Sequence, residues 1–438
     1  VLERAEADTE GLSWDTDDRS LVRVTRRDFE DATKLPTELV EEMARTQAES
    51  QPVWVEARRR GDWSLYAPRM ERTVELARRT AEAYGYDGGR PMDALIQREE
   101  PGLTAADVER VFGQLRETIV PLVREIATRP QPPDLLAGSF DPADRQVAFG
   151  LDVVREMGYD LQRGRLDLST HPFTIGLGRG DVRITTRVES GLTSLYSTIH
   201  EAGHGMYEQG TAPGIDRTPL AGGATSGVHE SQSRLWENQV GRGRAFADWV
   251  VPRLREAFAA AMTGIDAEGY YRSVNRVQPS YIRVDADEVT YNLHIMLRTE
   301  LETELLEGRL AVRDVPEAWN QKLHDYLGLD PPASASQGCL QDIHWTFPGL
   351  GSFVGYTLGN VIGPQLLATA RQALPDLEEQ VRRGEFAPLL TWLQDNVYRH
   401  GRKFTPNELL RRVTGQALTA EHWAAYIRDK FGALYDLD

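Results

Sequence analysis

The chain has 438 residues, and its 50 basic and 67 acidic side chains give a formal net charge of −17. Hydrophobic residues make up 40% and charged residues 27%, so the chain can bury a substantial core and wholesale disorder is excluded. No run approaches the roughly 20 apolar residues of a membrane helix, and the acidic balance argues against a nucleic-acid surface. The single cysteine, Cys339, excludes a disulfide framework and a cysteine-built zinc site, which favours a soluble, cytoplasmic protein.

The N-terminal third of the chain is predicted to be helical. Between residues 21 and 126, apolar side chains recur at helical spacing among arginines, glutamates and alanines. Thr104 is followed three residues later by Asp107, which is the pattern of a capping box at the start of a helix. Glycine-containing breaks separate the expected helices at residues 61–62, 85–89 and 100–102.

The middle of the chain has a different pattern. Two short β-like runs, 172–177 and 181–188, flank a glycine-containing turn and predict a hairpin. We expect the second run, which carries Arg183, to be an edge strand that pairs with an extended peptide. A helix is predicted over 192–209 and another over about 228–240, with a flexible glycine-containing turn between them.

Residues after Pro252 are predicted to form helices again, with breaks near 328–332 and 346–351. The sequence contains no internal repeat and no low-complexity tract. As a whole, the pattern predicts a mainly α fold in which residues 1–438 form a single large helical domain with one small β-sheet beside its centre.

One five-residue motif carries the clearest chemical signal: His200, Glu201, Ala202, Gly203 and His204. Histidines four residues apart project from the same face of a helix, so this pair can hold one metal ion. Glu201 would stand beside that ion, where its carboxylate can take a proton from a zinc-bound water as the water attacks a carbonyl. The alternative is a pair of surface histidines on a helix.

A catalytic zinc needs a third protein ligand and an open fourth position. A metzincin would place a histidine six residues after His204, but that residue is Gly210. The other common arrangement takes a glutamate from the following helix, and Glu230 stands at the start of the helix expected there. Glu208 and Glu237 are rival ligands, but the first lies one turn further along the same helix and the second lies two turns into the next one. We therefore predict Glu230.

Six blocks of residues follow one another in a fixed order: His171-Pro172-Phe173, Asp181-x-Arg183-x-Thr185, His200 to His204, His229-Glu230-Ser231-Gln232, Ile282-Arg283-Val284-Asp285-Ala286-Asp287, and Gly338-x-x-Gln341-Asp342-x-His344-Trp345. With these blocks the chain resembles, over essentially its whole length, the thermostable-carboxypeptidase family of zinc metallopeptidases, named for the carboxypeptidase Taq. The resemblance implies a helical fold with a deep active-site groove, related in architecture to angiotensin-converting enzyme and neurolysin. It also implies release of single residues from peptide C-termini, and a homodimer.

Two features depart from the family pattern. Members of the family carry a further segment of several dozen residues ahead of the position of Val1, so we expect this N-terminal segment to be missing here. After Trp345, the usual glycine-serine-phenylalanine run is replaced by residues 346–353. Tyr356 nonetheless keeps its expected place.

Two residues are candidates for stabilising the reaction's oxyanion. Attack on a peptide carbonyl makes a tetrahedral oxyanion, and a donor that strengthens its bond there is worth about 10²–10³ in rate. His344 and Tyr356 are the candidate donors, and the resemblance supports both. For each of them, an ordinary hydrogen-bonded core residue is the alternative.

An exopeptidase must also recognise the free C-terminal carboxylate, and a planar guanidinium can bind it through two hydrogen bonds. Among many arginines we favour Arg283, because it lies in one of the six blocks. A structural salt bridge to Asp285 or Asp287 is the alternative for this residue. Arg183 and Arg187 in the predicted strand are the second choices.

Three further residues are predicted to support the substrate site. Gln341 and Asp342 could orient His344 or a ligand, and a purely structural turn is equally consistent with their positions. His229 could shape the pocket beside Glu230, and a capping or core histidine is its alternative.

These features together predict a metallocarboxypeptidase with one Zn²⁺ per chain, although Co²⁺ would suit the same ligands. It would hydrolyse the C-terminal bond of peptides with broad specificity, in cytoplasmic peptide turnover. Neither nucleic acid nor a membrane is an expected partner. The alternatives are an oligopeptidase or dipeptidyl carboxypeptidase with the same zinc site and, from another class, a non-catalytic peptide-binding protein.

Overall fold

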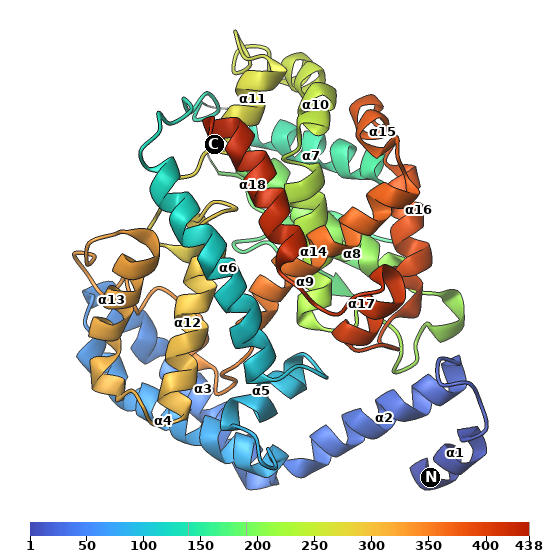
Figure 1. Cartoon of the computed structure of the whole chain (residues 1–438), viewed down its shortest axis with the longest axis vertical. Helices are drawn as coiled ribbons and strands as arrows, with labels where there is room; N and C mark the ends of the chain where they lie inside the picture. Colours follow the sequence, from blue (N-terminus) through green and yellow to red (C-terminus); the bar gives the residue numbers. More distant parts are fainter. Residues whose placement is uncertain (139, 190, 438) are drawn as a thin grey trace. The chain divides into compact units, whose positions relative to one another are not determined.

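The computed structural model describes residues 1–138, 140–189 and 191–437. Helices dominate this part of the chain and one small sheet accompanies them (Figure 1), which confirms the predicted mainly α class. Within the same ranges, none of the helices is long and apolar enough to cross a membrane. The chain divides into two compact units, each assembled from three segments. Unit 1 contains Val1–Thr25, Gln131–Arg276 and Leu358–Tyr426, and unit 2 contains Arg26–Pro130, Val277–Thr357 and Ile427–Asp438.

Unit 1 carries the predicted metal motif and the sheet. Its helices are α1 (Leu2–Thr9), α7 (Ala143–Met157), α8 (Thr193–Gln209), α9 (Ser226–Arg234) with a π-helical continuation (Leu235–Val240), α10 (Arg244–Ala257), α11 (Ala267–Val274), α15 (Leu377–Arg383), α16 (Ala387–Asn396) and α17 (Pro406–Thr414). Three more helices contain the boundaries between segments: α2 (Asp17–Lys34), α14 (Val354–Ala373) and α18 (Glu421–Tyr435).

The sheet consists of β1 (Leu166–Leu168), β2 (Thr174–Gly176) and β3 (Val182–Thr186) in the order β1-β3-β2. The antiparallel pair β2–β3 confirms the predicted hairpin. The parallel strand β1 was not predicted, because three residues are too few to show an alternating pattern. β3 is paired on both sides, so the expectation that Arg183 lies on an edge strand is wrong. The open edges belong to β1 and β2.

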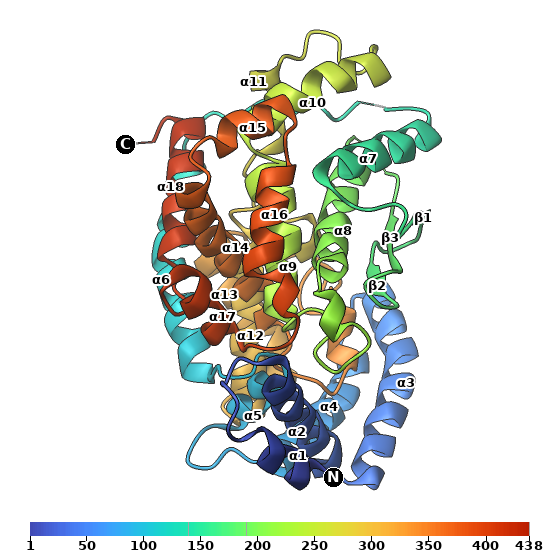
Figure 2. The ribbon, with the colours of Figure 1, turned by 90° about the vertical axis from the view of Figure 1, so that its right-hand side faces the viewer.

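The sheet packs on α8 through the alternate residues of its central strand. Val182, Ile184 and Thr186 are all fully buried, as period-2 alternation requires for the face that is covered. In Figure 2 the strands lie beside α8, the helix that carries the metal motif. The helix runs over Thr193–Gln209 and stops at Gly210, as predicted.

The two helices of the metal motif approach each other closely because of two glycines. A Cβ atom built on Gly203 of α8 would stand 2.7 Å from the Gln232 carbonyl oxygen and 2.7 Å from the Ser233 Cα of α9. On the other side of α9, a Cβ on Gly359 of α14 would stand 2.6 Å from the Glu230 Cβ. Both distances are shorter than any real Cβ contact, so α9 fits between its neighbours only where these positions lack a side chain.

Unit 2 is built from α3 (Thr37–Arg60), α4 (Trp63–Tyr84), α5 (Pro91–Glu99), α6 (Ala105–Ile126), α12 (Tyr291–Leu306) and α13 (Val315–Leu327), with 3₁₀ turns at Arg283–Asp285 and Ile343–Thr346. The predicted capping box is present at the start of α6, since Thr104 Oγ1 accepts from the backbone N–H of Asp107 and the Asp107 side chain accepts from the backbone N–H of Thr104. Almost every residue of α12 is buried, so this helix is the centre of the unit. Cys339 is buried, as expected for a small apolar residue.

Candidate metal centre and active site

Three side chains of unit 1 place potential metal ligands at one point. His200 and His204 lie one turn apart on α8, and Glu230 lies on α9. The Glu230 Oε2 atom is 3.6 Å from His200 Nε2 and 3.3 Å from His204 Nε2, and all three ligand atoms lie within 4.8 Å of one another. Two imidazole nitrogens and one carboxylate oxygen at this spacing suit a divalent metal with an open coordination position.

The Glu237 carboxylate orients the His200 ring so that its Nε2 atom faces the point where the three ligand atoms meet. His200 Nδ1 donates to Glu237 Oε2 at 2.9 Å. Burial raises the pKa of Glu237, but Arg234 and His200 outweigh that effect and hold the pKa well below its usual range, so this carboxylate can only accept. The Nδ1 atom must therefore carry the hydrogen, which leaves Nε2 with its lone pair for a metal.

A second chain of hydrogen bonds reaches His204. His229 Nε2 lies 2.8 Å from Glu208 Oε1, and His229 Nδ1 lies 2.5 Å from His204 Nδ1. Burial raises the pKa of Glu208, but the bond to His229 outweighs it and the net pKa is lowered, so Glu208 accepts from Nε2. One hydrogen then bridges the two Nδ1 atoms, and its place on His204 leaves the Nε2 of that ring free.

The protonation states of the three ligands follow from their surroundings. Burial lowers the pKa of His204 to about 4, so this imidazole is neutral near pH 7. Burial raises the pKa of Glu230, but Arg234 and His200 outweigh it and hold the pKa well below its usual range. Burial lowers the pKa of His200, but Glu230 and Glu237 outweigh it and raise the pKa, so a proton and a metal compete for the Nε2 of this ring as the pH falls.

Two arginines balance the buried carboxylates of the centre. Arg234 Nε donates to Glu230 Oε1 at 2.8 Å, and its Nη1 lies 3.3 Å from Glu237 Oε2. Arg242 Nη2 donates to Glu237 Oε1 at 3.2 Å, and its guanidinium stacks 3.8 Å from the Tyr196 ring centroid. Neither arginine was predicted from the sequence, although Arg234, four residues after Glu230 on the same helix, has the spacing of an ion pair.

Glu201 points to a different partner from its two histidine neighbours. It is only 6% exposed, and its Oε2 accepts a 2.6 Å hydrogen bond from Thr174 Oγ1 on strand β2. The same hydroxyl lies 2.9 Å from the Glu201 carbonyl oxygen, so its single hydrogen is shared between two acceptors of α8, which ties the edge of the sheet to the helix. Burial raises the pKa of Glu201, while His200 and Thr174 partly oppose the shift. A carboxylate of raised pKa is better matched to accepting a proton near neutral pH.

The two rival ligands have other contacts in the structure. Glu208 bonds to His229 and accepts from the backbone N–H of Gly223, and Glu237 bonds to His200. Each of these two carboxylates therefore accepts a hydrogen bond from a histidine ring. Within the described residues, the group of histidines, cysteines and acids that could hold a metal contains His200, His204 and Glu230.

Arg283 lies in unit 2 and has a different partner from either aspartate considered in the sequence. Its Nε and Nη2 donate to Asp342 Oδ1 at 3.1 and 2.8 Å, and its Nη1 donates to the Tyr291 hydroxyl at 3.2 Å. The residue is 7% exposed. Burial lowers its pKa, but Tyr291 and Asp342 outweigh that effect and raise it. The alternative of a salt bridge to Asp285 or Asp287 is wrong.

Gln341 and Asp342 hold Arg283. Gln341 Oε1 accepts from the Arg283 backbone N–H at 2.7 Å, and Asp342 accepts from the guanidinium. Asp342 also lies 3.6 Å from the buried Arg298, whose guanidinium covers the Trp345 ring at 3.2 Å. Burial raises the pKa of Asp342, but the two arginines outweigh it and lower the pKa. Arg298 was not predicted from the sequence, although Glu302, four residues later on the same helix, has the spacing of an ion pair and accepts from Arg298 Nε at 2.9 Å.

His344 and Tyr356 lie around the same aromatic ring. The Phe353 ring centroid is 4.9 Å from that of His344 and 5.5 Å from that of Tyr356. His344 Nδ1 is 4.0 Å from Asp342 Oδ1, which is too long for a hydrogen bond. Burial lowers the pKa of His344 to about 4, so the ring is neutral near pH 7 and can donate one N–H.

The second-choice arginines are paired at the surface of unit 1. Arg183 Nη2 lies 2.7 Å from Asp181 Oδ2, and the side chain is 47% exposed. Arg187 Nη2 lies 2.9 Å from Glu189 Oε2. Such exposed pairs are weak, so either guanidinium could exchange its partner at little cost.

Comparison with known proteins bears on this geometry. The sequence profile described as carboxypeptidase Taq (M32) metallopeptidase matches residues 1–431. The chain is 41% identical over 426 residues to thermostable carboxypeptidase 1 of Thermus thermophilus, covering 94% of this chain and 83% of that protein. It is 36% identical to carboxypeptidase 1 of Bacillus subtilis, covering 97% of this chain and 84% of that protein. The crystal structure of an M32 carboxypeptidase from Deinococcus radiodurans superposes with a TM-score of 0.95 at 46% identity, covering 99% of this chain and 88% of that one.

The fold and the metal centre thus define a metal-dependent peptide hydrolase. The chain belongs to the carboxypeptidase Taq (M32) family of metallopeptidases and is a metallocarboxypeptidase. Membership of this family implies a divalent metal and peptide substrates.

Proposed function

We propose that this metallocarboxypeptidase binds one zinc ion through His200, His204 and Glu230 and removes single residues from peptide C-termini with broad specificity. The observation that carries the proposal is the convergence of two Nε2 atoms and one carboxylate oxygen within 4.8 Å. This donor set is that of catalytic zinc in peptidases, and Co²⁺ would suit it as well. When bound, such an ion supplies polarisation of a carbonyl oxygen and makes water more acidic.

Glu201 is the proposed general base. Its carboxylate is next to the ligands in sequence, and Thr174 holds its Oε2 through a 2.6 Å bond. Because burial raises the pKa of Glu201, this group can accept a proton from the attacking water and return it to the leaving amine. Glu237 and the Glu208–His229 pair hold the two ligand rings in orientation.

Arg283 is the proposed group that recognises the substrate's terminal carboxylate. A guanidinium has five N–H donors, and Asp342 and Tyr291 account for three of them. Asp342 takes the Nε side of the group, which leaves one N–H on Nη1 and one on Nη2. These two donors are available for charge-assisted hydrogen bonds to a substrate carboxylate. His344 and Tyr356 are proposed as donors to the oxyanion, and Arg183 and Arg187 are the next candidates for substrate contacts.

The experiment that tests the function is mass spectrometry of a peptide digested over time, with and without a chelator. Loss of single C-terminal residues, abolished by the chelator, is the expected outcome. Release of dipeptides would favour a dipeptidyl carboxypeptidase, and internal cuts an oligopeptidase. Chelator-resistant cleavage would contradict the metal-dependent proposal.

A charge-preserving variant tests the role of Arg283. Arg283→Lys keeps a cation for Asp342 but loses the planar fork. Loss of a buried charge-assisted contact costs about 2–5 kcal/mol, so kcat/KM for free-acid peptides should fall by roughly 30-fold or more. C-terminally amidated peptides are the control, because their cleavage should be slow in both proteins. An equal fall for both peptide types would contradict carboxylate recognition by Arg283.

Assembly and location complete the proposal. We propose a homodimer in the cytoplasm, where the enzyme would turn over small peptides. The oligomeric state is checked by light scattering of the purified protein. A monomer at micromolar concentration would contradict the homodimer.

A further inference from the structure

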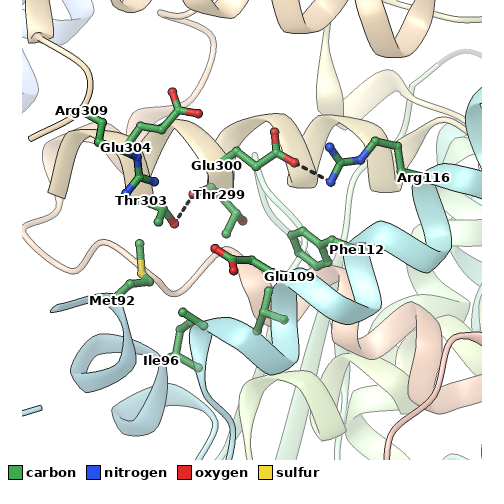
Figure 3. Close-up of a pocket in the computed structure, with 12 residues that line it drawn as sticks. Met92, Ile96, Glu109, Phe112, Arg116, Thr299, Glu300, Thr303, Glu304 and Arg309 are labelled. Carbon is green, nitrogen blue, oxygen red and sulfur yellow. Dashed lines mark hydrogen bonds and ion pairs between the residues drawn. The ribbon is translucent and has the colours of Figure 1, made fainter. Parts of the chain in front are cut away.

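Unit 2 contains a cavity of about 220 Å³ between α12 and the pair α5–α6. One wall is apolar and is formed by Met92 and Ile96 of α5 and by Val108 and Phe112 of α6, all at most 2% exposed. The facing wall belongs to α12. Figure 3 shows Thr299 and Thr303 on the side of α12 that faces the apolar wall, whereas the carboxylates of Glu300 and Glu304 extend away from that wall. None of the residues that line the cavity belongs to the metal centre.

The α12 wall is polar and presents two hydroxyl groups. Thr299 and Thr303 are four residues apart, so they lie on the same face of the helix. Thr303 Oγ1 donates to the Thr299 carbonyl oxygen at 2.9 Å. Thr299 is only 5% exposed, and its buried hydroxyl has no hydrogen-bond partner within the described part of the chain. A buried hydroxyl without a partner is costly, and a ligand in the cavity would satisfy it.

Charged groups of both signs stand at the two ends of the cavity. At one end Arg116 Nη2 lies 3.0 Å from Glu300 Oε1, and at the other end Glu304 and Arg309 line the cavity (Figure 3). Glu109 projects from α6 between them. Each of these groups also has an ion-pair partner: Glu300 and Glu304 lie 2.8 and 3.3 Å from Lys322 Nζ, Glu109 pairs with Arg90 at 2.6 Å, and Arg309 pairs with Glu307. The side chains of Glu109 and Arg309 are 56% and 54% exposed, so these two groups can exchange their partners for a ligand at little cost. An anion or a cation alone would meet groups of its own sign, whereas a zwitterion can pair with both.

We propose that this cavity binds a free α-amino acid with an apolar side chain, of the size of leucine. The side chain would lie against the α5–α6 wall, the ammonium and carboxylate would meet the charged ends, and one of them would bond to the Thr299 hydroxyl. The cavity volume of about 220 Å³ is smaller than the roughly 300–1,000 Å³ of sites for drug-sized molecules, so it suits a smaller ligand such as a single amino acid. Such an amino acid is also what a carboxypeptidase releases, so the cavity would sense product in a place distinct from the metal ligands.

A methyl reporter in the cavity wall tests the proposal on the whole metal-loaded enzyme. The chain has seven methionines, and Met92 lines the cavity. With ¹³C-methyl methionine, the Met92 signal is identified by its loss in Met92→Leu. Titration with L-leucine should shift this signal in a saturable way. Glycine, which lacks the side chain, and N-acetyl-leucine, which lacks the ammonium, should each shift it much less.

Matched variants separate binding at the hydroxyl from a general disturbance. Thr299→Val replaces the hydroxyl with a methyl group of similar shape and should weaken leucine binding by roughly two- to tenfold. Thr299→Ser should restore most of it. Thr80→Val is the control, because Thr80 is a buried threonine on α4 that does not line the cavity.

Two results would overturn the proposal. The first is a Met92 signal that does not move with L-leucine while the other methionine signals show a folded protein. The second is an equal response to leucine and glycine, which would show that the apolar wall recognises nothing. Because the reporter does not depend on turnover, either result is distinguishable from failure of the proposed peptidase activity.

Discussion

The close approach of α8 and α9 at Gly203 can be tested by adding one methyl group. In Gly203→Ala the new Cβ would stand 2.7 Å from the Gln232 carbonyl oxygen and the Ser233 Cα, where ordinary contacts begin at 3.4 Å. The helices must therefore separate by about 0.7 Å, which exceeds the ±0.2 Å within which metal–ligand distances vary. Since Glu230 lies on α9, the third ligand would be drawn away from both histidines.

The magnitude of the effect follows from two opposing contributions. Overpacking costs about 1–3 kcal/mol, and alanine gains about 1 kcal/mol over glycine inside a helix. The free energy of unfolding without metal should therefore fall by only about 0–2 kcal/mol. Metal affinity should fall more, by roughly 10- to 100-fold, which is the range seen when a residue that holds a metal ligand in place is mutated.

Competition with a chromogenic chelator measures the metal affinity, and urea unfolding measures the stability. Gly113→Ala is the matched control, because a Cβ at this position of α6 meets nothing within 4 Å. It should stabilise the protein slightly and leave metal binding unchanged. Wild-type metal affinity in Gly203→Ala would refute the argument that this contact places Glu230.

Three more predictions concern single side chains. Glu201→Gln should keep the metal content near wild type but lower kcat by several orders of magnitude, and retention of most activity would identify another base. Glu208→Ala should weaken metal binding by roughly 10- to 100-fold because His229 loses its acceptor, whereas Glu208→Gln, which keeps an acceptor oxygen, should lose less; equal losses would contradict the orienting role. Burial lowers the pKa of His294 from 6.5 to about 4 in the folded protein, so the unfolded chain binds this proton first as the pH falls. The free energy of unfolding should therefore drop by up to about 3 kcal/mol between pH 6.5 and 4, and an equally steep drop in His294→Leu, measured by urea unfolding, would contradict this cause.

The sequence determined the local part of the site. The two histidines are four residues apart, and one helical turn brings them together whatever the rest of the chain does. The capping box of Thr104 and Asp107 and the end of α8 at Gly210 were likewise readable, since each depends on residues within one turn. Helix α9 also formed where expected, two residues earlier than predicted and with a π-helical end.

Only the tertiary structure decided which distant groups meet. Glu208, Glu230 and Glu237 were all plausible ligands by sequence, and the crossing of α8 and α9 brings only Glu230 to both Nε2 atoms. The partner of Arg283 is Asp342, 59 residues away, rather than a neighbouring aspartate.

The order of the sheet was equally beyond the sequence, because the parallel strand β1 pairs with the side of β3 that the hairpin leaves open. Periodicity reports which face of an element is buried, but it does not report what buries that face. Contacts between elements depend on close approach at a few positions such as Gly203, and a sequence pattern gives no sign of which glycine a neighbouring helix will need.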